Sequence, residues 1–466
     1  MVELRMVRPS GRLSEVSDVK SRLLWIRLLI VLALPALGGC AQSLRNINAA
    51  RDAFAVGDLA RASETLRDVS EGRSRFADAA SLDLAMVELA AGDAPAAEKR
   101  LRELRDRFDH LPEIAPVREA AAVATDDTAR LFRPAGYEEV MIRAMLAICS
   151  LAHDQFDAES YTLQAMSKQA ELARRAEERG ISLESSAFQP IALAPYLRGV
   201  LREATHRDYD DAARAYQLVS AVQPQFAPAQ EDIRRASVGT HSAPGHGVLY
   251  VIACVGRGPV LQEACLPTTT MSLQIASVVL NAATNEQEGE DRDVPTLPNI
   301  ASVNVPQVVL PTSEVAALGV RVGGELHGAT QTLTHVGELA QSQVEAEMPW
   351  TIARAVVRRA AKETTVATIG DAFGLEGDAG SLFHFAASSA WSGLEQADTR
   401  CWGLLPREIQ VLRAELPAAT HEIHLEPLGF AGQALSTGLS HQVEIVDGKN
   451  HYLVAIAPGT FVYLVR

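Results

Sequence analysis

Histidine and cysteine side chains are the groups in this sequence that could hold a metal ion or act as nucleophiles, and their spacing supports neither role. The chain has 12 histidines and 5 cysteines, with no Cys-x2-Cys pair and no Cys/His cluster of the kind that binds zinc. His421 and His424 stand three residues apart on a predicted strand, so their side chains point to opposite faces. The sequence has no Gly-x-Ser-x-Gly elbow, Walker loop or His-Glu-x-x-His motif, and its glycine-rich stretch at 374–380 follows no convincing strand. We therefore expect no catalytic, cofactor-binding or metal-binding residues.

The length and composition of the chain limit its class of fold and its partners. It has 466 residues, of which 47% are hydrophobic and 22% charged, and a formal net charge of -15. This composition is typical of a soluble globular protein, and the length allows two or three domains with cores of their own. The acidic balance argues against non-specific binding to nucleic acid, which needs clustered Lys and Arg.

The N-terminal 39 residues have the organisation of an export signal. Six basic residues precede an apolar run from Leu28 to Leu37. Ten residues at about 1.5 Å each cannot cross a hydrocarbon core about 30 Å thick, but this length suits a signal peptide over residues 1–39. The run ends in Leu37-Gly38-Gly39-Cys40, which resembles the lipobox of bacterial lipoproteins.

The lipobox resemblance implies a lipid anchor. The Cys40 thiol would receive a diacylglycerol, cleavage would follow Gly39, and the new amine would be acylated, for example with palmitate. Several acyl chains hold a protein on a membrane where a single chain does not. Ala41, in place of aspartate at the next position, implies the periplasmic face of the outer membrane. The alternative is an uncleaved hydrophobic helix whose cysteine is incidental.

Four cysteines follow Cys40, and an exported protein can pair them. Cys254 and Cys265 flank a turn expected at 256–259. In a simple hairpin, Cys265 lies four positions (about 13 Å) from the residue opposite Cys254, beyond the Cα separation of about 7 Å that a disulfide allows. This spacing disfavours the bridge, although the pairing stays open. Cys149 lies in an apolar helical pattern and is expected to be buried.

A phrase of the form Gly-Asp-x-x-x-Ala recurs in the first half of the chain. It occurs at Gly57-Asp58 and, 35 residues later, at Gly92-Asp93, and looser versions begin at His153-Asp154 and Arg207-Asp208. These phrases resemble tetratricopeptide repeats, which are pairs of antiparallel helices about 34 residues long. We expect such a helical repeat domain over residues 40–238, with the four aspartates capping second helices. A generic α-solenoid of unknown repeat count is the alternative.

Helical repeat arrays present a concave groove that binds peptides or other proteins. Four tyrosines could line it: Tyr137, Tyr161, Tyr196 and Tyr216. The alternatives are that the chain's own segments fill the groove and that these tyrosines belong to the core.

The hydrophobic period changes after a linker expected at 239–247, where small and turn-forming residues dominate. A β-rich, sandwich-like domain is expected over 248–466, with inserted helices near 336–363, divided at Pro349, and near 379–394. A hairpin with its loop at 447–450 would place Ile445 opposite Tyr452. Other strands are expected at 248–255, 259–264 (beside the first), 303–310, 317–322, 408–413 and 461–465.

The segment 395–406, Glu-Gln-Ala-Asp-Thr-Arg-Cys-Trp-Gly-Leu-Leu-Pro, leads into the strand expected at 408–413. With the layout around it, this segment resembles a family of uncharacterised bacterial envelope lipoproteins. The resemblance implies a constrained loop, in which Asp398, Arg400 and Trp402 are our candidates for contact with a partner or ligand. The alternative is an internal Asp–Arg pair with a packed tryptophan.

The fold class expected from these features is α+β and multidomain: a tetratricopeptide-like α-solenoid followed by a β-rich domain. The function expected is that of a lipid-anchored periplasmic scaffold or adaptor that binds envelope proteins through its helical repeats, with no catalysis. The alternative is a lipoprotein that binds glycan or peptidoglycan through the β-rich domain. Cys40 is the expected lipidation site, and the sequence gives neither the partner's identity nor the oligomeric state.

Overall fold

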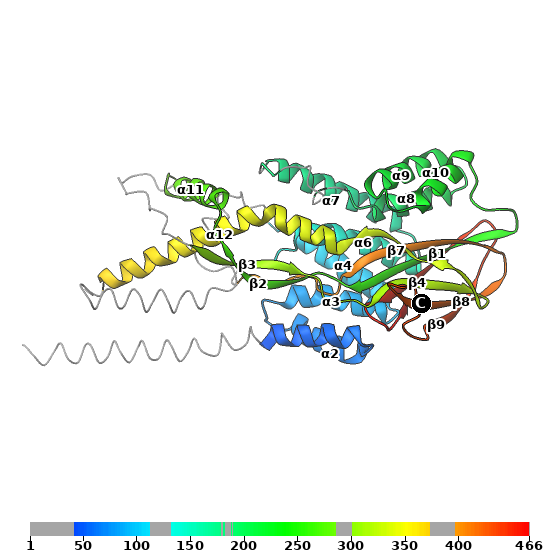
Figure 1. The fold of residues 1–466 in the computed structure, drawn as a ribbon, viewed down its shortest axis with the longest axis horizontal. Helices are drawn as coiled ribbons and strands as arrows, with labels where there is room; N and C mark the ends of the chain where they lie inside the picture. The colour runs from blue at the N-terminus through cyan, green and yellow to red at the C-terminus, as the bar shows by residue number, and fades with distance from the viewer. Residues whose placement is uncertain are drawn as a thin grey trace, which may run out of the picture.

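The computed structural model describes residues 42–111, 132–178, 180–181, 188, 190–285, 301–372 and 397–465. Within these residues the protein is mixed α+β, with helices first and sheets after them, as the sequence predicts (Figure 1). Cys40 and the helix predicted near 379–394 lie outside the described residues.

The first half is a series of antiparallel helices. A helix over residues 42–55 precedes them. Those that follow are α2 (Leu59–Glu71), α3 (Ala77–Ala90), α4 (Ala94–Asp109), α6 (Gly136–His153), α7 (Ala158–Glu178), α8 (Leu193–Glu203), α9 (Tyr209–Val222) and α10 (Pro228–Val238).

Two of the four predicted aspartate caps are present. Asp58 accepts a hydrogen bond from the Arg61 N–H at the start of α2, and Asp93 does the same for Ala96 in α4. The glycines before both aspartates have the positive φ that these tight turns require. The prediction is wrong for Asp154, which bonds the Phe156 N–H ahead of α7, and for Asp208, whose side chain caps no N–H of α9.

The second half forms three sheets. The five-stranded sheet has the order β11-β10-β1-β7-β6, the four-stranded sheet β5-β4-β8-β9, and the ribbon β2-β3 stands apart. Their strands are β1 (His246–Arg257), β2 (Val260–Pro267), β3 (Ser302–Val309), β4 (Val315–Val322), β5 (Glu325–Ala329), β6 (Gln331–His335), β7 (Pro406–Pro417), β8 (Thr420–Gly429), β9 (Leu439–Glu444), β10 (Asn450–Ala457) and β11 (Tyr463–Val465).

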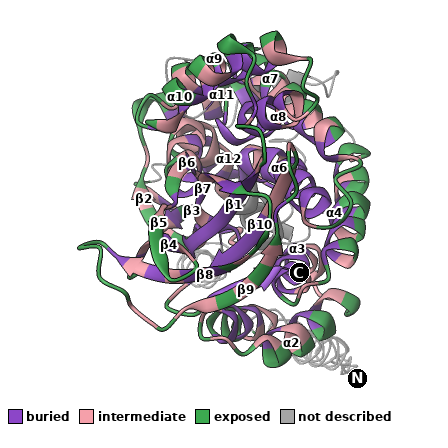
Figure 2. Cartoon of the chain, turned by 90° about the vertical axis from the view of Figure 1, so that its right-hand side faces the viewer, coloured by how far each residue is buried: buried purple, intermediate pink, exposed green. Residues whose placement is uncertain are grey.

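Strand β1 lies between two hydrophobic cores. Its residues Leu249 and Val251 join a core shared with the four-stranded sheet, while Tyr250 and Ile252 join the core of the helices. Helices, five-stranded sheet and four-stranded sheet therefore form three layers. Figure 2 shows the helices as an arc around β1, β7 and β10. Residues from both halves of the chain belong to the larger core, and β1 begins at His246, inside the linker predicted at 239–247. The division of the chain into two domains at this linker therefore stays a prediction.

A separate arm projects from one end of the molecule (Figure 1). The arm consists of β2, β3, α11 (Thr270–Asn285) and the part of α12 (Val336–Ala372) that follows residue 347. It has its own hydrophobic cluster, in which Ala276 and Val279 of α11 pack with Val303 of β3 and Ile352 of α12. None of the helices in the described residues is long and apolar enough to span a membrane.

Two predicted strand pairings are wrong. Strand β10 does not form a hairpin with β9; it pairs in parallel with β1, so that Tyr452 stands beside Tyr250. Strand β9 instead pairs with β8, and Ile445 lies in the core between the two sheets. Strand β2 does not return beside β1 but pairs with β3. Of these strands, β10 takes a partner far away in the sequence, and most of its residues are buried there.

Pro349 does not divide the helix predicted near 336–363. α12 is continuous from Val336 to Ala372 with the proline inside it. Packing holds both parts, since Val336 and Ala340 belong to the core of the body and Val356 to the core of the arm. This burial offsets the one hydrogen bond that proline removes.

Candidate functional site

The predicted residues Asp398, Arg400 and Trp402 lie in a loop, residues 397–405, that is threaded through the core. The Arg400 guanidinium donates from Nε and Nη2 to the two Asp398 carboxylate oxygens, at 2.8 and 2.6 Å. It also donates to the Arg75 carbonyl at 3.3 Å and lies over the Phe132 ring. Trp402 is fully buried. These are the internal ion pair and packed tryptophan of the alternative interpretation; contact with a partner stays a prediction.

Buried charged side chains from the helices hold this loop in place. The Arg51 guanidinium pairs with Asp83 of α3 (Nε to Oδ2, 2.7 Å) and donates to the Cys401 carbonyl at 2.8 Å. Asp83 Oδ1 accepts from the Leu404 N–H at 2.9 Å. The loop has no strand partner, so these side chains satisfy backbone groups that would otherwise be buried unpaired. The sequence analysis did not identify Arg51 or Asp83, because each looks like an ordinary solvent-exposed charge of a helix.

Glu138 of α6 is the second buried carboxylate at the loop. It accepts from the Trp402 N–H at 2.7 Å and from the Ala135 N–H at 2.9 Å. Burial raises the pKa of Glu138 to about 7, because desolvation of the charged form outweighs these hydrogen bonds. The side chain therefore titrates near neutral pH while it supports the loop.

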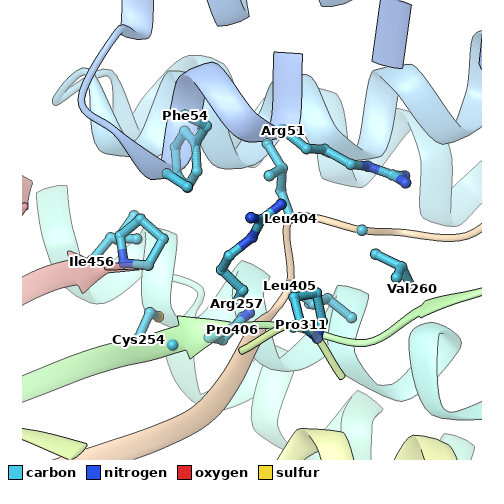
Figure 3. Close-up of a pocket in the computed structure, with 15 residues that line it drawn as sticks. Arg51, Phe54, Cys254, Arg257, Val260, Pro311, Leu404, Leu405, Pro406 and Ile456 are labelled. Atoms are coloured by element: carbon cyan, nitrogen blue, oxygen red, sulfur yellow. The ribbon is translucent and has the colours of Figure 1, made fainter. Parts of the chain in front are cut away.

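Figure 3 shows a small cavity next to the loop, where the helix 42–55, the end of β1 and the start of β7 meet. Arg51, Cys254 and Leu405 line it, and its volume is about 20 Å³, enough for about one water molecule. Burial raises the pKa of Cys254 to about 12, so its thiol stays protonated and is a poor nucleophile. This cavity is too small for a substrate.

A larger cavity, of about 420 Å³, lies on the helical layer between the C-terminal end of α4, the first turns of α6 and the middle of α7. Its lining is mostly polar and carries both signs of charge. The residues are Phe108, Asp109, Leu111, Arg133, Glu139, Arg143, Gln164, Ser167, Lys168, Glu171 and Arg175. We call it the α4–α7 cavity.

Ion pairs fix the side chains of the α4–α7 cavity. Arg143 contacts both oxygens of Asp109, at 2.6 and 2.7 Å. The Lys168 ammonium lies 2.9 Å from Glu171, 3.4 Å from Glu139 and 3.6 Å from Asp109. Preorganised donors and acceptors of both signs suit a polar or charged ligand.

The sequence carries a local signal for this cavity, although none of its residues was predicted as part of a site. Gln164, Lys168, Glu171 and Arg175 recur at helical spacing, which places them on one face of α7. The same pattern is typical of a solvated helix face, so it does not by itself indicate a cavity.

Other predicted features have clear positions. His421 bonds the Pro417 carbonyl and His424 the Ser440 hydroxyl, and across the described residues no group of three or more His, Cys, Asp or Glu side chains suits a metal ion. Cys254 and Cys265 are unpaired thiols in different sheets, and Cys149 is buried as predicted. The four tyrosines are buried, so they belong to the core.

Comparison of the chain with known proteins gives no match. No protein-family model matches the chain, and no curated protein or solved structure matches it.

Proposed function

We propose that this protein is a lipid-anchored envelope adaptor that binds another envelope protein at the α4–α7 cavity of its helical layer. Cys40 would carry the acyl chains, and the helical layer would present the cavity to the partner. The observation that supports the proposal is the cavity itself: its volume of about 420 Å³ is in the range of binding pockets, and its ordered charges can contact polar groups of a partner.

The inner face of the helical layer is a poor candidate, because the five-stranded sheet packs on it. Tyr463 of β11 stacks on Phe54 at 5.1 Å between ring centroids and donates from its hydroxyl to the Phe54 carbonyl. Asn450 of β10 donates to the Val200 carbonyl of α8. A partner at that face would have to displace this sheet, whereas no strand lines the α4–α7 cavity, so the cavity is the less costly site.

The chemistry of the cavity favours a polar segment of a protein. Arg143 and Lys168 are largely buried cations, each held by carboxylates, so a bound segment would replace or extend existing ion pairs. Such pairs give specificity more than affinity. Asp398 and Arg400, at the loop 397–405, are a second and weaker candidate for partner contact.

The test uses charge reversal at Lys168 with a matched control on the same helix. Lys168→Glu places a fourth carboxylate beside Asp109, Glu139 and Glu171, whereas Arg174 is exposed, is not part of the cavity lining and pairs with Glu178. A photo-crosslinker at Gln164 would identify the partner in intact envelopes. We expect the crosslink in the wild type and in Arg174→Glu, and its loss in Lys168→Glu.

The glycan-binding alternative predicts a different result. If peptidoglycan sediments with the wild type and with Lys168→Glu equally, and no protein crosslinks at Gln164, binding belongs elsewhere in the chain and the adaptor proposal is wrong.

A further inference from the structure

Helix α11 in the arm has an outer face without charge. No residue from Thr270 to Asn285 is charged. Met271, Gln274 and Val278 are spaced as on one side of a helix, and the exposed fractions of Met271 and Val278 are 54% and 61%. Ala276 and Val279, on the other side, pack into the core of the arm.

The arm lies at the end of the molecule where a lipid anchor at Cys40 would be attached. The helix 42–55 packs into the core of the body through Ile47 and Phe54, and its Asp52 contacts Arg257, the last residue of β1 before the arm begins, at 2.6 Å. The N-terminal end of this helix (dark blue) lies toward the side from which the arm projects, and both α11 and the later turns of α12 lie further out in that direction (Figure 1). Cys40 stands two positions before residue 42, so the chain between them spans at most about 7 Å.

We propose that the arm rests on the phospholipid surface that holds the anchor, through the exposed face of α11. This inference relies on the lipid anchor of the proposed function. Because the arm extends past the attachment point, a bilayer held within about 7 Å of residue 42 meets the arm before it meets the body of the protein.

The chemistry of α11 fits lipid better than a charged partner. An interfacial helix buries apolar side chains at the boundary between headgroups and acyl chains. With no charge on α11 and a net charge of -15 on the chain, zwitterionic lipids are the better match, and anionic lipids would repel the protein. The anchor and the arm would together set the orientation of the protein, and with it that of the α4–α7 cavity, at the membrane.

A fluorescent label on α11 tests the contact. The acylated chain carries Cys265→Ser, which removes the exposed thiol, and Gln274→Cys, labelled with a polarity-sensitive fluorophore. In phosphatidylcholine proteoliposomes we expect a blue-shifted emission that nitroxide-bearing lipids quench. A label at Phe156→Cys, an exposed position between α6 and α7, is the control and should stay aqueous. Met271→Asp with Val278→Asp should abolish the shift, whereas Leu326→Asp, at an exposed residue of β5, should not.

Each outcome has a separate meaning. An intact mass without acyl chains contradicts the anchor, and with it the proposed function. If the protein is acylated but its Gln274→Cys label stays aqueous, only the arm proposal is contradicted. The arm proposal is also contradicted if the label is shielded equally in detergent and the chains crosslink as dimers, because another copy of the chain would then cover α11.

Discussion

Glu138 in the helical layer accepts a hydrogen bond of 2.7 Å from the backbone N–H of Trp402, 264 residues further along the chain. With the Asp83–Arg51 pair, this contact ties the loop 397–405 into the core of the helices. The two halves of the sequence thus share buried polar contacts as well as apolar ones. The loop 397–405 therefore joins the two halves of the fold.

The raised pKa of Glu138 predicts a pH-dependent stability. A carboxyl with a folded-state pKa of about 7 and an ordinary pKa of 4.5 binds more protons in the folded state, so the free energy of unfolding falls as pH rises between these two values. In Glu138→Gln the part of this fall that Glu138 contributes should disappear, whereas Asp83 and Asp232, whose pKa values burial also raises, keep theirs. At acidic pH the variant should be about 1–3 kcal/mol less stable, because the hydroxyl oxygen of the protonated acid can still accept from the second of the Trp402 and Ala135 N–H groups, whereas the amide NH2 can only donate.

Urea unfolding at several pH values, followed by circular dichroism, measures this effect. Glu103→Gln, at an exposed residue of α4, should keep the wild-type pH profile. A Glu138→Gln profile with the same slope as the wild type would show that another group titrates.

Asp83→Asn should destabilise the fold strongly. The change leaves the buried Arg51 guanidinium without its counter-charge and turns an amide NH2 toward a donor, a loss of about 3–5 kcal/mol for a broken buried pair. Asp211→Asn, which breaks an exposed pair with Arg214, is the matched control and should leave the melting temperature unchanged. Equal melting temperatures for both variants would mean that the Arg51–Asp83 pair does not hold the loop.

The thiols should differ sharply in reactivity. Cys265 is exposed, whereas Cys149, Cys254 and Cys401 are buried. In the folded chain expressed from residue 40 with Cys40→Ser, a maleimide should label one thiol quickly and the other three only after denaturation. Mass spectrometry of the labelled chain counts the adducts. No label at Cys265, with a mass deficit that reduction restores, would reveal a disulfide and contradict the placement of Cys254 and Cys265 in separate sheets.

Local sequence patterns predicted individual strands and turns well, because these features do not depend on which segment packs beside them. The apolar run 248–255 lies within β1, the stretch 303–310 overlaps β3, and the Gly57 and Gly92 phrases mark the two tight turns before α2 and α4. Periodicity and turn chemistry determine these features directly.

Pairings and buried charges could not be predicted in the same way. Strand β10 pairs with β1, about 200 residues earlier in the chain. The turn residues Asp447-Gly448 had predicted a hairpin between β10 and β9, the strand before it, and these two strands do not pair. Asp83 and Glu138 resemble solvated helix charges until the loop 397–405 packs over them. Lys168 likewise gains its role only when α4 and α6 bring carboxylates beside it.

The measurement that tests the lipid anchor most directly is the intact mass and membrane fractionation of the wild-type protein beside Cys40→Ser. We predict a wild-type mass that corresponds to cleavage before Cys40 plus acyl chains, with the protein in the outer-membrane fraction, and a variant that loses both. Full-length masses for both proteins, with both still in the membrane, would contradict the lipid anchor and with it the adaptor and arm proposals.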